Sequence, residues 1–177
     1  MKTISISRPL PDEYAPFYAS YIERVPENAA LLPTMQAAHR DLHSLLAPLT
    51  EEQGLYRYAD GKWTIKEVVQ HLIDAERVFA YRALRFARKD STSLAGFDEN
   101  HYAAVSGANA RTLQELLAEF AVVRASTFAL LQSFPDESVF LQCGEASGKS
   151  VSVRALAHII AGHELHHLAV LRERYLR

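Results

Sequence analysis

Hydrophobic residues recur at three- and four-residue steps in four long stretches of the chain, the period of an α-helix with one buried face. This pattern predicts helices over residues 27–47, 64–89, 112–133 and 153–175. The segments between them lack this long helical period: residues 91–110 contain only a short helical pattern around 98–105, and residues 136–149 are expected to form a loop. Four amphipathic helices joined by loops predict an all-α fold, a four-helix bundle.

Polar residues mark where three of these helices begin. Thr64 with Glu67 and Thr112 with Glu115 have the spacing of capping boxes, and Ser152 is a candidate N-cap. Before the bundle, residues 1–26 are rich in proline and aromatic residues and are expected to form an arm with one or two helical turns. Only residues 3–7 show an alternation typical of a strand. The chain is therefore expected to be one domain, an arm over 1–26 and a bundle over 27–175.

Composition narrows the class of protein. A chain of 177 residues has the size of one ordinary domain, and its net charge of −2 gives no broad electrostatic footprint for nucleic acid or an anionic membrane. A single cysteine, Cys143, excludes an internal disulfide and a cysteine zinc cluster, and is interpreted as incidental. No apolar run reaches signal-peptide or membrane-span length, so a soluble cytoplasmic protein without nucleic-acid or membrane partners is expected.

Histidines are the first candidates for a metal or catalytic site, since four of the eight lie between residues 158 and 167. At about 100° per residue, His167 falls inside the apolar stripe of the last helix and His163 on its edge, so both are expected to point into the bundle, one turn apart. His158 and His166 fall on its far side. Two imidazoles four residues apart can hold one cation. The alternative is a pair of core histidines with satisfied hydrogen bonds.

A third ligand is expected upstream, because only ten residues follow His167. His71, at the border of the apolar stripe of the second long helix, is the best candidate, and Asp74 is placed to orient a ligand. His39 and His43 form another pair with four-residue spacing and are interpreted as surface-to-boundary residues. The string from His163 to His167 also satisfies the zincin H-E-x-x-H rule, but without a downstream third ligand a metalloprotease is disfavoured.

Two short motifs together resemble the DinB/YfiT-like family of small four-helix bundle proteins. They are Trp63-Thr64-Ile65-Lys66-Glu67 followed by His71-Leu72-Ile73-Asp74, and His163-Glu164-Leu165-His166-His167. The likeness spans about residues 28 to 175. It implies a divalent metal held by His71, His163 and His167, with His166 not a ligand. It further implies a homodimer and a small-molecule substrate, with either hydrolysis or transfer of a low-molecular-weight thiol. The chain departs from the family at Leu168-Ala169, where a polar pair is usual, and at Glu164, which is not general.

Three histidines on one cation leave an open position, as catalytic sites do. Zinc is the expected metal, with nickel, iron or manganese as alternatives, because imidazole ligands suit zinc, nickel, copper and iron alike and do not identify the metal. Glu164, on the inward arc, is a candidate general base, with a buried acid paired to an arginine as the equal alternative. Glu76 is a second candidate base, or a partner for Arg82 or Arg85. A bundle that binds a metal or small molecule without catalysis, as a sensor or interaction module, is the other class of function.

The second long helix is basic toward its C-terminus. Its cationic residues there are Arg77, Arg82, Arg85, Arg88 and Lys89. We interpret them as a solvated face that interacts favourably with the helix dipole. A surface for an acidic thiol cofactor is the alternative interpretation.

Overall fold

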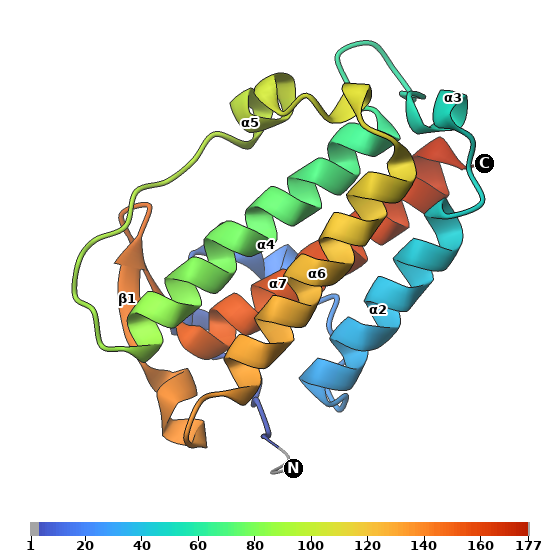
Figure 1. The fold of residues 1–177 in the computed structure, drawn as a ribbon. Helices are drawn as coiled ribbons and strands as arrows, with labels where there is room; N and C mark the ends of the chain where they lie inside the picture. Colours follow the sequence, from blue (N-terminus) through green and yellow to red (C-terminus); the bar gives the residue numbers. More distant parts are fainter. Residues whose placement is uncertain (1–3, 177) are drawn as a thin grey trace.

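The four predicted long helices are present and form a bundle. In the computed structural model, which describes residues 4–176, they are α2 (Leu31–Leu46), α4 (Ile65–Ala87), α6 (Leu113–Gln132) and α7 (Val153–Val170). Figure 1 shows them side by side, with α7 continued by a π-helical turn over Leu171–Tyr175. The four-helix bundle is confirmed, although its first helix begins four residues later than expected.

The predicted caps explain where the helices begin. Thr64 accepts a hydrogen bond from the Glu67 amide, and the Glu67 carboxylate accepts one from the Thr64 amide at 2.7 Å. Thr112 and Glu115 form the same reciprocal pair, and Ser152 Oγ accepts from the Ala155 amide at 3.0 Å. These bonds satisfy backbone donors that the first turn of a helix leaves unpaired.

The N-terminal arm is a chain of short turns that ends against α7. It comprises 3-10 turns over Pro11–Glu13 and Pro16–Tyr18 and the helix α1 (Ala19–Ile22). α1 packs on α7 where Gly162 has no side chain: a Cβ there would lie 1.9 Å from the Tyr21 carbonyl oxygen. Glycine thus lets the arm lie directly on the helix that carries His163.

Two sequence expectations about strands are wrong. Residues 4–7 form no strand, and Thr3 lies outside the described residues. The expected loop over 136–149 instead contributes to an antiparallel hairpin of β1 (Cys143–Ala146) and β2 (Lys149–Ser152). The hairpin turns at Ser147 and Gly148, which both have positive φ, the conformation that a two-residue turn requires. A strand of four residues is too short for its alternation to stand out in the sequence.

The connection from α4 to α6 runs along the outside of the bundle (Figure 1). It carries α5 (Glu99–Val105), close to the predicted position, and a 3-10 turn over Ala108–Ala110. Leu94 in the same connection forms a bridge with Ala146 of the hairpin, so the connection and the hairpin meet at one end of α4. Elsewhere, the described residues form two more short elements, α3 (Glu51–Gly54) and a 3-10 turn over Glu137–Leu141. Within the part of the chain that the structure describes, no helix is long and apolar enough to cross a membrane.

Two clusters of buried side chains make up the core. One joins the arm, the hairpin and the first half of α7 to the end of α4, with Phe86, Phe79 and Ile160 among its members. The other joins the start of α4 to α6 and the end of α7, around Leu72 and Phe120. α4 and α7 contribute to both clusters, and they carry His71, His163 and His167.

Candidate metal centre

Three buried histidines from two helices meet at one point. His71 Nε2 of α4 lies 2.8 Å from His163 Nε2 of α7, and His167 Nε2 lies 3.1 Å from the same atom. The nitrogens that could serve as ligands all lie within 4.8 Å of one another. The side chains are 8%, 5% and 9% exposed. The structure therefore brings together the three histidines that the sequence singles out.

The helices and their aromatic neighbours fix these rings. His163 and His167 are one turn apart on the face of α7 that packs against α4. Trp63, just before α4, lies with its ring centroid 4.6 Å from that of His71 and 6.4 Å from that of His167. The ring of Tyr21 in the arm lies 5.2 Å from that of His163. Aromatic side chains thus limit how far each imidazole can rotate.

Burial keeps the three imidazoles neutral. It lowers the pKa of His71 to about 4, and it lowers the pKa of His163 and His167 well below the usual 6.5. The neighbouring histidines push the pKa of His163 and His167 further down, because two cations would repel each other at this distance. Neutral imidazole is the form that coordinates a metal.

The spacing of the nitrogens fits a shared cation. Zinc binds histidine nitrogen at about 2.0–2.1 Å, so ligands separated by about 90–110° lie about 2.9–3.4 Å apart. The observed 2.8 and 3.1 Å are close to this range. The cluster has three members among the described residues, which leaves the fourth direction to the cavity. Asp74, expected to orient a ligand, instead accepts a hydrogen bond from Gln70 at 2.9 Å, and His167 Nδ1 is buried without a hydrogen-bond partner in the described residues.

A cavity of about 280 Å³ lies over the three histidines. Its wall is mostly aromatic, with Arg82, Glu99 and Ser147 as its other polar members. The residues that line it, besides the three histidines, are Phe17, Tyr18, Tyr21, Trp63, Ala75, Phe79, Arg82, Phe97, Glu99 and Ser147. A cavity of this size takes a small molecule.

Glu164 and Glu76 belong to a buried charge network rather than to the cavity wall. Arg124 of α6 donates to Glu76 at 2.7 Å and pairs with Glu164 at 3.0 Å, while the other Glu164 oxygen lies 3.2 Å from His39 Nδ1. All three charged side chains are at most 3% exposed. The expected pairing of Glu76 with Arg82 or Arg85 is wrong, because Arg124 on another helix takes that place.

The ion pair of Glu164 with Arg124 argues against Glu164 as a general base. It agrees with the other interpretation of the sequence, in which Glu164 is a buried acid paired with an arginine. It also weakens the zincin interpretation, in which Glu164 would have to face the ligand site.

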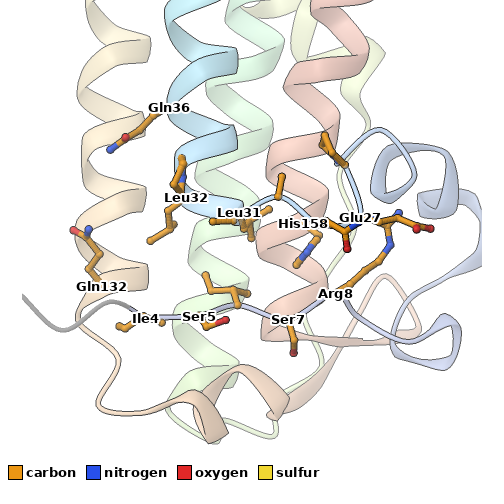
Figure 2. Close-up of a pocket in the computed structure, with 16 residues that line it drawn as sticks. Ile4, Ser5, Ser7, Arg8, Glu27, Leu31, Leu32, Gln36, Gln132 and His158 are labelled. Carbon is orange, nitrogen blue, oxygen red and sulfur yellow. The ribbon is translucent and has the colours of Figure 1, made fainter.

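The other histidines lie outside the cluster. His39 contacts Glu164, His43 and His101 are exposed, and His166 is half-buried with its ring 5.3 Å from that of Tyr21. His158 is buried, not on an open face, because the N-terminal segment covers that side of α7. Its Nδ1 donates to the Arg154 carbonyl at 2.9 Å, and its ring lines a separate cavity of about 620 Å³ (Figure 2).

Comparisons with known proteins agree with this architecture. The sequence profile of the DinB superfamily matches residues 34–171. A protein of Geobacillus thermodenitrificans is 26% identical over 129 residues, 72% of each chain, and one of Geobacillus kaustophilus is 27% identical over 130 residues, 73% of each. Both carry the name "putative metal-dependent hydrolase".

Among solved structures, YfiT from Bacillus subtilis is similar with a TM-score of 0.73 at 18% sequence identity. The match covers 84% of this chain and 89% of that one. YfiT is described as a probable metal-dependent hydrolase with an unusual four-helix bundle topology. This similarity shows that the two proteins share a fold.

Proposed function

Because the chain belongs to the DinB superfamily, we propose that it is a metal-dependent hydrolase of a small molecule. His71, His163 and His167 are the proposed ligands of one divalent cation. The observation that carries this proposal is the meeting of three neutral Nε2 atoms, 2.8 and 3.1 Å apart, at the base of a cavity. The names of the Geobacillus relatives support the same class of reaction.

Zinc is the proposed metal; nickel and iron also suit three imidazoles, whereas manganese prefers oxygen ligands. A divalent cation held there would act as a Lewis acid and lower the pKa of water at its open position. Hydrolysis would form a bond between a water oxygen and the electrophilic carbon, break the bond to the leaving group, and pass the proton of the water to that group.

The residues around the cluster support this chemistry by position. Trp63, Tyr21 and Phe79 cover the imidazoles and keep bulk water from their sides. The pairs of Arg124 with Glu76 and Glu164 tie α6 to α4 and α7, and so hold the two ligand-bearing helices in register. A role of Glu164 as the general base stays an untested prediction; its ion pair with Arg124 supports a positioning role.

Transfer of a low-molecular-weight thiol is the second candidate, because Arg82 in the cavity wall would hold an acidic thiol cofactor. The non-catalytic alternative predicts a closed site with four protein ligands. The three-membered cluster in the described residues and the cavity above it favour an enzyme. A homodimer is also part of the proposal, and light scattering on the purified protein would test it.

The first experiment is elemental analysis of untagged protein, prepared without a nickel column, beside the variants His163→Ala and His43→Ala. We expect about one equivalent of transition metal in the parent and in His43→Ala, whose side chain is exposed, and little in His163→Ala. Circular dichroism would confirm that each variant keeps its helices. Full metal in His163→Ala, or none in the parent after reconstitution, would overturn the proposed site. A screen of esters, amides and thiol-conjugation substrates then distinguishes the two reactions.

A further inference from the structure

Arg82 is a buried cation that no carboxylate neutralises within the described part of the chain. Its side chain is 3% exposed, although the sequence suggests a solvated face. Its Nη2 donates to the Ala95 carbonyl at 2.9 Å and to Ser147 Oγ at 3.2 Å. Both partners are neutral, and none of the ion pairs within 4.0 Å among the described residues includes Arg82.

The other buried lysine and arginine side chains among residues 4–176 behave differently. Lys66, also 3% exposed, pairs with Glu51 at 2.6 Å, and Arg124, 2% exposed, pairs with Glu76 and Glu164. Buried charges are normally paired because a charge removed from water is costly without an opposite charge nearby. Arg82 is therefore the exception among three.

The position of Arg82 in the cavity wall suggests what its charge is for. Arg82 lines the cavity that has the three histidines in its wall. Its guanidinium carbon lies 5.9 Å from the ring centroids of both Phe79 and Phe97. It follows His71 on α4 by eleven residues, about 16 Å along the helix axis at 1.5 Å per residue, and helical side chains lean back toward the N-terminus. The cavity thus has a cation toward one end, the histidine cluster toward the other, and aromatic rings between.

We propose that Arg82 binds the anionic group of the substrate, a small molecule with a carboxylate or phosphate at one end of an apolar body. The proposal rests on the proposed function, since the reactive carbon of that molecule would lie over the histidines. Both Nη2 protons of Arg82 already donate to Ala95 and Ser147, so the anion would be bound by the N–H groups of Nε and Nη1, and charged N–H groups bind carboxylate and phosphate oxygens strongly. Phe79 and Phe97 would contact the apolar body. Glu99, exposed in the same wall, would oppose the anion.

The chain contains a reporter for the test. Trp63 is its one tryptophan and lines the cavity, so its fluorescence reports ligand binding without any turnover. The probes are 3-phenylpropionate, phenyl phosphate and the neutral 3-phenylpropanamide. Each is titrated into the protein as purified and after treatment with a chelator. We expect at least one anion to bind about tenfold or more tightly than the amide, and the preferred anion identifies the substrate group.

Four variants separate anion binding from a structural role. Arg82→Met should bind anion and amide equally, while Arg82→Lys should keep part of the preference. Glu99→Gln should strengthen anion binding, because it removes a negative charge from the wall. Arg77→Met, on the same helix but half-exposed and outside the cavity wall, is the matched control and should change nothing.

The ratio of affinities is the decisive measurement, because Arg82 also ties the hairpin turn to the 91–97 segment through its hydrogen bonds. Loss of that tie alone would change the affinities for anion and amide together. An anion preference that survives in Arg82→Met, or its absence from the parent, would overturn the proposal. If Arg82→Met does not fold, Arg82→Lys and Glu99→Gln decide. Elemental analysis tests the metal site separately, so an Arg82-dependent preference in a protein without metal would refute only the proposed function.

Discussion

Gly162→Ala should destabilise the protein, although alanine is the better helix former. Gly162 lies inside α7, immediately before His163. A Cβ at this position would lie 1.9 Å from the carbonyl oxygen of Tyr21 and 2.4 Å from its carbonyl carbon. Both atoms belong to the backbone of the arm, so no side-chain rotation can relieve the overlap.

The two opposing effects can be compared. Replacing glycine by alanine in a helix interior contributes about 1 kcal/mol of stability. A carbon–oxygen contact needs about 3.3 Å, so the arm would have to move about 1.4 Å away from α7. Overpacking of this kind costs about 1–3 kcal/mol, and a backbone overlap belongs at the upper end. We expect a net loss of about 2 kcal/mol, which lowers the melting temperature of a domain this size by about 4–8 °C.

Thermal unfolding followed by circular dichroism at 222 nm measures this directly. Gly54→Ala is the matched control, because its Cβ would approach only side-chain carbons of Lys66, the nearest at 3.0 Å, and no backbone atom, so its melting temperature should change little. The displaced arm should also move the Tyr21 ring away from His163 and weaken metal retention. A melting temperature equal to or above that of the parent would refute the reasoning, since it would mean that the arm moves aside at no cost.

Two further predictions concern charges. Arg124→Met leaves Glu76 and Glu164 buried without their partner, and should lower the free energy of unfolding in chemical denaturation by about 3–5 kcal/mol. Arg172→Met is the control, because its pair with Asp41 is exposed, and should lower it by less than about 1 kcal/mol. Similar losses in the two variants would contradict the buried network. Arg154 holds the pKa of Glu13 at about 2, below the ordinary 4.5. This carboxylate therefore stabilises the fold fully above about pH 4.5 and loses its contribution as the pH falls toward 2. The melting temperatures of the parent and Glu13→Gln should differ at pH 7 and converge near pH 2–3, and a constant gap would show that the Glu13 charge is not responsible.

The local features of the fold could be predicted from the sequence because they depend on neighbouring residues. Helix periodicity gives the four long helices, and the boxes of Thr64 with Glu67 and Thr112 with Glu115 fix two of their starts. The angular positions of His163 and His167 on one helix place them on the same face, and the structure agrees. Each of these inferences uses contacts within about four residues along the chain, where helical geometry leaves little freedom.

Only the tertiary structure determines the contacts between segments that are far apart in the chain. Arg124 pairs with Glu76 across 48 residues, and the arm covers the face of α7 that carries His158. Arg82, interpreted from the sequence as solvated, is buried because the 91–97 segment and the hairpin turn close over it. The angle of a residue on its own helix says which way it points, but only the packing of the other segments determines whether water, a carboxylate or an empty cavity lies there. In this protein, helix periodicity was enough to place His163 and His167 on one face of their helix. The burial of Arg82, the cation that we propose binds the substrate, depends on distant segments and could not be predicted in this way.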